Sequence, residues 1–490
     1  MKTLSQLLQN IEYLELINFI ESEIKSISYD SRLVNSDGLF VALRGTKIDA
    51  HNFIPNVINS GCKIIVCEEV PNLDLDLDAT FIKVASTRKA LAEISHWWFE
   101  RPTKKMKIIG VTGTNGKTTS TFILAQILEK LGYKVGIIGT TGIYFANRRY
   151  EATHTTPESF ELCKIFAEMI HSGVQYVSME VSSHALDQYR VYGIDFDGAI
   201  FTNLSHDHLD YHKTMDNYAK AKKILFDTLK EDSFAIVQGD DNYSNFILSE
   251  TKSKFKAKVG RGSFNDYIIS NEIIKTDGLN FDLVYRNEII NIVTNLIGKF
   301  NIDNTALAAV LCLEMGFDKD KVISAIKSIE PAEGRMAAIK LRSGATGIVD
   351  YAHTPDALEK ALLTCRQILE INKNNGHLIC VFGCGGDRDR TKRPKMGHIA
   401  AYIADLVVIT DDNPRTEPAE QIRQEILQGV PDNLKHKVVE IADRAEAIRY
   451  SIEQSKEGDI LIVAGKGHEK YQIIGKNRFY FDDFEQLKQG

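Results

Sequence analysis

A strand, a glycine-rich turn and a helix follow one another between residues 107 and 131. The run from 108 to 111 is apolar and β-prone, glycines stand at 110, 113 and 116, and a helical pattern begins after Thr119. Glycines in this setting let backbone N–H groups surround phosphate oxygens, and the following helix directs its positive end at them. The segment therefore predicts a phosphate-binding loop inside an α/β sheet.

The predicted loop uses a short form of the motif. Its usual spacing asks for a glycine five residues before Gly116, and Val111 occupies that position. We expect Lys117 to reach the terminal phosphates of ATP or GTP and the Thr118 hydroxyl to ligate Mg²⁺. The phosphate-binding residues predicted here are Gly113, Thr114, Asn115, Gly116, Lys117, Thr118 and Thr119.

Length and charge narrow the class of protein. A chain of 490 residues is long enough for about three domains. Its net charge of −7 gives no basic footprint for nucleic acid. The N-terminus has no apolar core of a signal peptide, and no apolar run is long enough for a membrane helix. The seven cysteines are scattered, as is typical of buried thiols in a reducing compartment, so we expect a cytoplasmic protein. We also expect a monomer.

The order of predicted elements indicates three α/β domains. Strands and helices alternate after a basic, proline-containing connector at 101–105, which predicts a doubly wound parallel sheet, and alternation resumes after 330–335. We therefore expect a smaller α/β domain at 1–104, a central phosphate-loop domain at 105–332 and a Rossmann-like α/β domain at 333–490. The main helices are predicted at 88–99, 302–315, 319–329 and 355–369.

Two groups of ionisable residues follow predicted strands. Glu180 ends a strand, where a carboxylate can ligate nucleotide-bound Mg²⁺. Three histidines and two aspartates crowd residues 206–212, a composition that fits zinc or a second Mg²⁺ near the phosphates. A helical run at 218–226 carries three lysines, and composition alone predicts a solvated basic face.

Four motifs resemble the ATP-dependent Mur ligases of peptidoglycan synthesis. They are Gly113-Thr-Asn-Gly-Lys-Thr-Thr119, Met179-Glu-Val-Ser-Ser-His184, Asn203-x-x-x-Asp207-His-Leu-Asp210 and Gly298-x-Phe-Asn301-x-x-Asn304. They occur in the family's order. The resemblance implies that ATP phosphorylates a substrate carboxylate to an acyl phosphate, which an amine then attacks to give an amide, ADP and phosphate.

The resemblance also assigns roles to residues. It implies catalytic roles for Lys117, Lys222, His208 and Arg190, with Lys222 carried as a carbamate that binds Mg²⁺. The implied metal ligands are Thr118, Glu180, His208 and Lys222. Further implied ATP contacts are Asn301, Asn304, Arg335, Asp350 and His353.

Residues 412–415 resemble the signature of family members that use meso-diaminopimelate. This amino acid carries a second carboxylate, which the Arg415 guanidinium would bind as a bidentate fork, while Glu469 would accept the distal ammonium. The resemblance implies addition of meso-diaminopimelate to the D-Glu γ-carboxylate of UDP-MurNAc-L-Ala-D-Glu. The implied substrate contacts are Tyr29, Ser31, Thr46, Thr155, Thr156, Ser182, Gln188, Arg190, Arg388, Asp412, Asn413, Pro414, Arg415, Gly465 and Glu469.

Two alternatives stay open at this point. The same ligase chemistry could use L-lysine, another diamine, or glutamate on a folate, although Arg415 argues against lysine and the N-terminal domain argues against folate. A protein of a different class, a nucleotide-switched binding protein without ligase activity, would not need the set Lys117, Glu180, His208 and Lys222.

Overall fold

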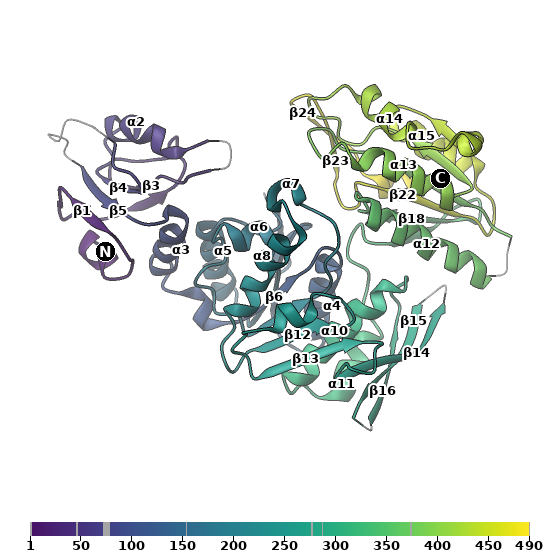
Figure 1. Cartoon of the computed structure of the whole chain (residues 1–490), viewed down its shortest axis with the longest axis horizontal. Helices are drawn as coiled ribbons and strands as arrows, with labels where there is room; N and C mark the ends of the chain where they lie inside the picture. The colour runs from purple at the N-terminus through teal and green to yellow at the C-terminus, as the bar shows by residue number, and fades with distance from the viewer. Residues whose placement is uncertain are drawn as a thin grey trace. The chain divides into compact units, whose positions relative to one another are not determined.

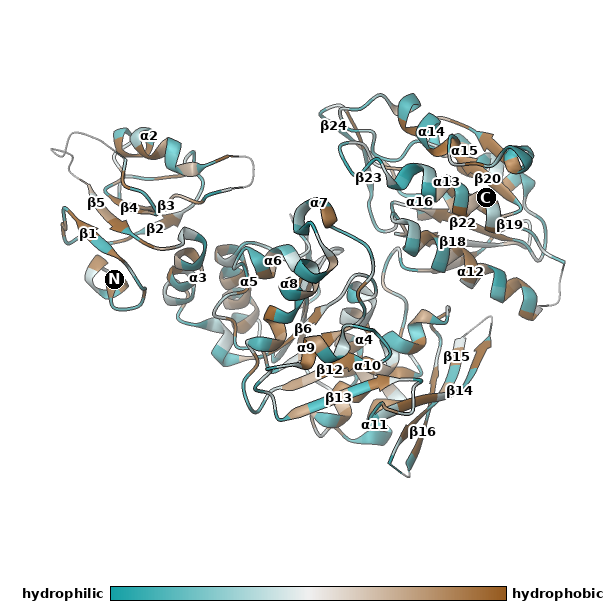
Figure 2. Ribbon diagram, in the orientation of Figure 1, coloured by the Kyte–Doolittle hydropathy of each residue, from teal (hydrophilic) through white to brown (hydrophobic). Residues whose placement is uncertain are grey.

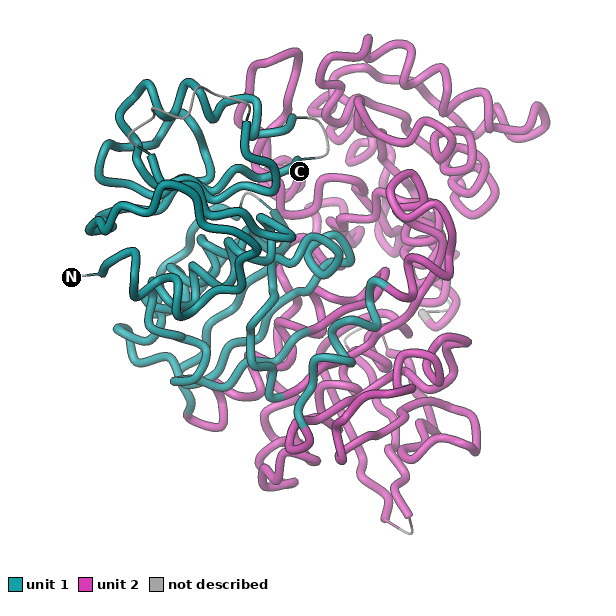
Figure 3. The backbone as a smooth tube through the Cα atoms, turned by 60° about the vertical axis from the view of Figure 1, so that its left-hand side comes forward, with its two compact units in different colours: residues 1–110, 133–197, 221–230 teal, residues 111–132, 198–220, 231–490 magenta. Residues whose placement is uncertain are grey.

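The computed structural model describes residues 2–45, 48–71, 79–152, 154–275, 278–286, 288–372 and 375–489. The chain forms two compact units (Figure 3). Unit 1 contains residues 1–110, 133–197 and 221–230, and unit 2 contains residues 111–132, 198–220 and 231–490. None of the helices within these described ranges is long and apolar enough to span a membrane.

The strands fall into three successive groups along the chain (Figure 1), as expected for three α/β domains. Strands β1–β5 lie within residues 15–83, β6–β16 within 107–294 and β17–β22 within 337–464, and β23 and β24, within 471–480, form a separate two-stranded sheet. The boundaries expected near 104 and 332 fall between these groups and stay predictions.

The first group is a five-stranded sheet in unit 1 with the order β1-β5-β4-β3-β2. Only β1 runs antiparallel to its neighbour. Alternate side chains of the strands face two separate apolar cores, one under α1 and α3 and the other under α2. The elements are α1 (Leu4–Leu8), β1 (Glu15–Ile17), β2 (Ser26–Ser28), β3 (Gly38–Val41), η1 (Ala50–Phe53), α2 (Ile54–Asn59), β4 (Ile64–Cys67), β5 (Thr80–Lys83) and α3 (Thr87–Trp98).

The rest of unit 1 pairs β10 in parallel with β7, which continues antiparallel through β8 to β9. The elements are η2 (Pro102–Lys105), β7 (Val135–Gly139), β8 (Gly142–Phe145), β9 (Arg148–Tyr150), α5 (Ser159–His171), β10 (Tyr176–Glu180) and α6 (Ser183–Asp187). Strand β6 (Lys107–Thr112) and helix α8 (Met215–Asp227) each contain residues of both units.

The central part of unit 2 begins as the parallel α/β sheet expected from the sequence and then changes direction. Strands β11 to β14 are parallel, whereas β14, β15 and β16 form an antiparallel extension that the sequence analysis did not predict. The elements are α4 (Lys117–Lys130), β11 (Gly198–Phe201), α7 (Leu209–His212), β12 (Phe234–Gln238), α9 (Ser244–Leu248), β13 (Phe255–Gly260), β14 (Tyr267–Lys275), β15 (Gly278–Tyr285), β16 (Glu288–Thr294), α10 (Phe300–Glu314) and α11 (Lys319–Ile326).

The last group is a six-stranded sheet with the order β17-β18-β22-β19-β20-β21, antiparallel only at β17. Residues 378, 380 and 382 of β19 face a core with α12–α14, and residues 379 and 381 face a core with α15 and α16. This doubly wound arrangement explains the apolar strands visible in Figure 2. The elements are β17 (Ala337–Lys340), β18 (Thr346–Asp350), α12 (Pro355–Asn372), β19 (Leu378–Phe382), α13 (Lys392–Ile403), β20 (Leu406–Ile409), α14 (Ala419–Leu427), η3 (Asp432–Lys437), β21 (Val438–Glu440), α15 (Arg444–Gln454), β22 (Ile460–Ala464), β23 (Tyr471–Ile474), β24 (Asn477–Tyr480) and α16 (Asp483–Lys488).

Candidate functional site

The glycine-rich turn lies between the end of β6 and the start of α4, as the sequence predicts. Gly113 has φ +150° and Gly116 has φ +86°, backbone conformations that favour glycine. A Cβ at Gly113 would lie 1.9 Å from Thr202 Oγ1, and one at Gly116 would lie 2.4 Å from Asn304 Oδ1. Both positions therefore require glycine, because the chain passes too close to its neighbours for any side chain.

The side chain of Asn203, just after β11, holds the turn in this shape. Its Oδ1 accepts the Asn115 N–H at 3.0 Å, and its Nδ2 donates to the Asn115 carbonyl at 3.0 Å. Thr202 Oγ1 donates to the same carbonyl at 2.6 Å. The Asn115 side chain donates in turn to Asp356 Oδ2 on α12, at 2.5 Å. The loop is thus fixed by residues from two other segments of unit 2.

Lys117 and Thr118 begin α4 and already have partners. The Lys117 ammonium donates to the carbonyls of Gly113 at 2.9 Å and Thr114 at 2.8 Å. The Thr118 hydroxyl accepts from Arg335 Nη2 at 3.1 Å. A bound phosphate would compete for Lys117 and Arg335, two positive groups beside the loop.

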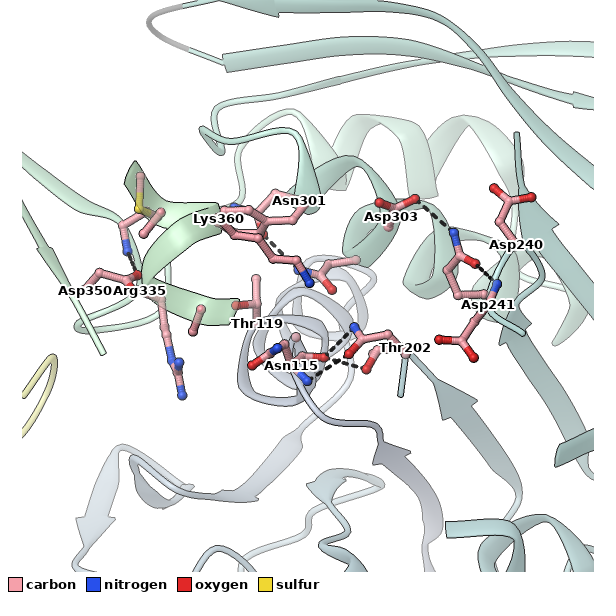
Figure 4. Close-up of a pocket in the computed structure, with 18 residues that line it drawn as sticks. Asn115, Thr119, Thr202, Asp240, Asp241, Asn301, Asp303, Arg335, Asp350 and Lys360 are labelled. Carbon is pink, nitrogen blue, oxygen red and sulfur yellow. Dashed lines mark hydrogen bonds between the residues drawn. The ribbon is translucent and has the colours of Figure 1, made fainter. Parts of the chain in front are cut away.

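A cavity of about 360 Å³ adjoins the loop (Figure 4). Seven of the residues expected to contact ATP line it, namely Asn115, Gly116, Thr119, Asn301, Asn304, Arg335 and Asp350. Gly113, Thr114, Lys117, Thr118 and His353 are not among the lining residues. Other residues of the wall were not predicted from the sequence, including Gln238, Asp240, Asp241, Asp303 and Lys360. Their position at or just after the end of β12, or in the first two turns of α10 and α12, was the only available signal.

The cavity wall carries donors and acceptors suited to a nucleotide. Arg335 lies over the Tyr351 ring, 4.7 Å from its centroid, and its buried Nε has no hydrogen-bond partner among the described residues. Burial raises the pKa of Asp350, although Arg335 and the N–H groups of Met336 and Ala352 oppose the shift. The unmatched guanidinium donor and the glycine turn fit an anionic ligand such as a nucleotide phosphate.

The histidine cluster lies around the left-handed residue His208 (φ +53°), which precedes α7. Burial would raise the pKa of Asp207, but the positive charges of His208, His353 and Lys117 outweigh it and hold this pKa below its ordinary value. No group of three or more His, Cys, Asp or Glu side chains in the described ranges could hold a metal ion. The zinc site left open by the sequence has no such ligand group there.

In unit 1, Glu180 ends β10 and is almost fully buried. Its carboxylate accepts the Thr140 N–H at 2.8 Å and the Thr140 hydroxyl at 3.1 Å. Thr155 Oγ1 lies 3.1 Å from the same Thr140 oxygen. The carboxylate is thereby held in one orientation at the carboxyl end of a parallel strand.

The unit 1 residues expected to hold the dipeptide lie together around Arg190. Its guanidinium donates to the Thr156 carbonyl at 3.0 Å and to Gln188 Oε1 at 2.8 Å, and it pairs with Glu158 at 3.0 Å. The Thr156 hydroxyl lies 3.4 Å from Ser182 Oγ. Arg190 is oriented by its neighbours, and Glu158 is a partner that the sequence analysis missed.

Two lysines of α8 contradict the expected solvated basic face. Lys222 is 1% exposed and Lys223 5% exposed, whereas Lys220 lies on the solvent side. The expectation was wrong for Lys222 and Lys223 because packing of the helix, and not its composition, decides which side is covered.

The N-terminal substrate residues are only partly placed. The Tyr29 hydroxyl donates to Glu161 on α5, and burial together with this carboxylate raises the pKa of Tyr29 above its ordinary value. Ser31 lies in the turn after β2. Thr46 lies outside the described residues.

The residues expected to bind the added amino acid come from three loops of unit 2. Asn413 Nδ2 donates to Glu469 Oε2 at 2.8 Å, and Gly465, with φ +115°, would place a Cβ 2.7 Å from Asp412 Oδ2. Burial and the neighbouring Asp412 charge raise the pKa of Glu469. Of the Arg415 guanidinium nitrogens, only Nη1 bonds to another described residue, the Gly386 carbonyl at 2.7 Å.

Two of these loops are bonded directly to each other. The Gly386 N–H donates to the Asn413 carbonyl at 2.9 Å, and Thr416 Oγ1 donates to Asp387 Oδ1 at 2.7 Å. A Cβ at Gly386 would lie 1.9 Å from the Pro414 carbonyl oxygen. Arg388, the next residue after Asp387 in the same loop, is exposed.

Three family models match successive parts of the chain. The Mur ligase middle domain matches residues 111–312, the Mur ligase glutamate ligase domain 334–467, and the Mur ligase family catalytic domain 23–97. A curated protein of Clostridium botulinum is 42% identical over 489 residues, covering 99% of both chains, and is named UDP-N-acetylmuramoyl-L-alanyl-D-glutamate–2,6-diaminopimelate ligase. The chain belongs to the Mur ligase family.

Other relatives agree with this assignment. A protein of the same name from Geobacillus kaustophilus is 42% identical and covers 94% of this chain and 93% of its own. A solved structure, also named as the 2,6-diaminopimelate ligase, is 32% identical with a TM-score of 0.67 and covers 95% of this chain and 94% of its own. MurF from Acinetobacter baumannii, at 22% identity and TM-score 0.63, shares the fold and covers 91% of each chain. This Mur ligase is an ATP-dependent ligase.

Proposed function

We propose that this Mur ligase joins meso-diaminopimelate to the D-Glu γ-carboxylate of UDP-MurNAc-L-Ala-D-Glu. The observation that carries the proposal is the grouping of one guanidinium, Arg415, with the carboxylates of Asp412 and Glu469 on loops bonded to one another. An amino acid with a carboxylate and an ammonium at its far end matches such a pair of opposite charges. The names of the relatives at about 40% identity support this substrate.

The chemistry needs two balanced steps. A γ-carboxylate oxygen of D-Glu attacks the γ-phosphorus of ATP, which forms an acyl phosphate and releases ADP. An ammonium group of diaminopimelate loses a proton, and the resulting neutral amine attacks the acyl carbon. Phosphate leaves, and the nitrogen loses a second proton as the amide forms. Lys117 and Arg335 would carry positive charge toward the phosphates, and Arg190 toward the substrate carboxylate.

Mg²⁺ would supply charge neutralisation to the phosphates when bound. Thr118 offers a hydroxyl at the start of α4, and Glu180 a carboxylate fixed by Thr140, both donor types that Mg²⁺ accepts. His208 and a carbamate on Lys222 would complete the proposed set.

The carbamate on Lys222 can be tested by ¹³C NMR. Enzyme in ¹³C-bicarbonate should give a carbamate resonance that Lys222→Met lacks, and active enzyme without that resonance would exclude the carbamate role.

The function is tested by phosphate release from ATP with UDP-MurNAc-L-Ala-D-Glu and a panel of amino acids. We expect turnover with meso-diaminopimelate and at most slow turnover with L-lysine. Turnover with lysine alone would replace the proposed amino acid, and none with any amine would favour a nucleotide-switched binding protein.

Arg415 is the residue that we expect to select the amino acid. Arg415→Ala should raise the KM for diaminopimelate by about 10- to 150-fold, the effect of losing about 1.5–3 kcal/mol of charged hydrogen bonding, and leave the KM for ATP unchanged. Arg449→Ala, a change on the exposed side of α15, is the control. An unchanged diaminopimelate KM would place its second carboxylate elsewhere.

The cytoplasmic location and the monomeric state remain predictions, which fractionation and light scattering would test.

A further inference from the structure

Lys466 is a fully buried lysine beside the amino-acid loops, with 0% of its surface exposed. Its ammonium donates to Asn413 Oδ1 at 3.3 Å and to the Tyr471 carbonyl on β23, and it lies 3.6 Å from Glu469 Oε2. A buried cation is costly unless it is matched by several acceptors. Lys466 is matched in this way by residues that are themselves expected to contact the substrate.

The ammonium and the Ile473 N–H together determine which way the Asn413 amide faces. Asn413 Oδ1 accepts from Lys466 and, at 2.8 Å, from the Ile473 N–H on β23. A flipped amide would place its NH₂ group against these two donors, which is unfavourable. Nδ2 is therefore directed to Glu469 Oε2, 2.8 Å away, where it donates to the carboxylate.

The same ammonium balances the negative charges of the site. Glu469 is buried near Asp412, and these two influences raise its pKa, while Lys466, the Asn413 amide and Arg415 lower it. Tyr351 and the buried Arg444 also face this carboxylate. Lys466 lies three residues before Glu469, and its ammonium directly approaches Oε2, at 3.6 Å.

We propose that Lys466 is a positioning residue for the added amino acid, acting through Asn413 and by keeping Glu469 in the charged form that accepts the substrate's distal ammonium. This inference rests on the proposed function. Lys466 itself has no surface for a ligand, so its effect reaches the substrate only through these two side chains.

The test compares the full-length enzyme with Lys466→Met and Lys466→Gln. Lys466→Met removes the charge at similar length, and Lys466→Gln keeps a donor for Asn413 while removing the charge. In both we expect the KM for diaminopimelate to rise about tenfold or more, the loss of one charge-assisted contact, with the KM for ATP unchanged. The acidic limb of kcat/KM for diaminopimelate should move to higher pH, because Glu469 without its cation is protonated more readily. Lys476→Met, an exposed lysine in the β23–β24 turn, is the matched control.

A double variant separates positioning from a general structural role. If Lys466 acts through Glu469, Lys466→Gln should have little further effect on the pH limb in a Glu469→Gln background. The inference would be overturned if the Lys466 variants had the same acidic limb and the same KM for diaminopimelate as Lys476→Met. It would also be overturned if their KM values for ATP and for diaminopimelate rose by equal factors. If Lys466→Met does not fold, as thermal unfolding would reveal, Lys466→Gln decides. Failure of the wild-type enzyme to use diaminopimelate would instead overturn the proposed function.

Discussion

Replacing Gly116 by alanine should weaken ATP binding more than the small size of the added methyl group suggests. The residue has φ +86°, and an added Cβ would lie 2.4 Å from Asn304 Oδ1. Asn304 cannot move freely, because it is buried, accepts from Ser120 Oγ at 3.2 Å and donates to Asn301 Oδ1 at 3.0 Å. Either the turn or this network has to change.

The cost can be separated into two contributions. Alanine in a left-handed conformation costs roughly 1–2 kcal/mol relative to glycine. Displacing Asn304 forfeits two hydrogen bonds worth about 1 kcal/mol each. Gly132, at the end of the same helix, has φ +95° but nothing within 4 Å of an added Cβ, so Gly132→Ala carries the first contribution only. The difference of about 2 kcal/mol corresponds to a factor of about 30 in affinity.

The assay is the KM for ATP in phosphate release, together with direct titration of ATP into each variant. We expect Gly116→Ala to weaken ATP binding about 30-fold more than Gly132→Ala, with similar folding of both by circular dichroism. If the two variants bind ATP within threefold of each other, the contact with Asn304 does not control the phosphate loop, and the reasoning from the Cβ position is wrong.

Two further predictions concern stability. Arg444 and Asp483 form a fully buried ion pair with bonds of 2.7 and 2.8 Å, so Arg444→Met should lower the free energy of unfolding in urea by about 3–5 kcal/mol by leaving Asp483 uncompensated. Replacing both by apolar residues should recover much of this loss, and a full loss in the double variant would contradict the argument. Hydrogen bonds from Arg390 and then Arg393 lower the pKa of Glu425 to about 2. Since a lowered folded-state pKa stabilises above the unfolded value, this contribution should disappear as the pH falls from about 4.5 to about 2. Glu425→Gln should flatten the pH dependence of unfolding in that window, and an unaltered slope would exclude the pairing as its source.

The phosphate loop could be predicted from the sequence because its constraints determine the residue types of the loop itself. Left-handed conformations and close approaches at Gly113 and Gly116 leave a direct mark in residue type. The alternation of strands and helices gave the three α/β domains for the same reason. By contrast, the antiparallel extension β14–β16 has no helix between its strands, so the repeating pattern used for the prediction does not reach it.

Contacts between distant segments could not be predicted. Asn115 bonds to Asp356, 241 residues away, and no spacing rule connects them. The burial of Lys222 and the role inferred for Lys466 likewise depend on what packs over each side chain. A lysine in a sequence is predicted to lie on the surface, and only the residues that pack over it in the structure can show otherwise.

The bonding between the loops at 385–389 and 411–417 has a consequence for how this enzyme's specificity can change. Gly386 and Asp387 in one loop are matched to Asn413 and Thr416 in the other. Exchanging one loop alone between ligases of different amino-acid preference would leave backbone and carboxylate groups unmatched, whereas exchanging both preserves the matches. The selectivity for the amino acid should therefore be transferred between ligases only when both loops are exchanged together. A chimaera that combines the two loops from different parents should lose activity toward either parent's amino acid.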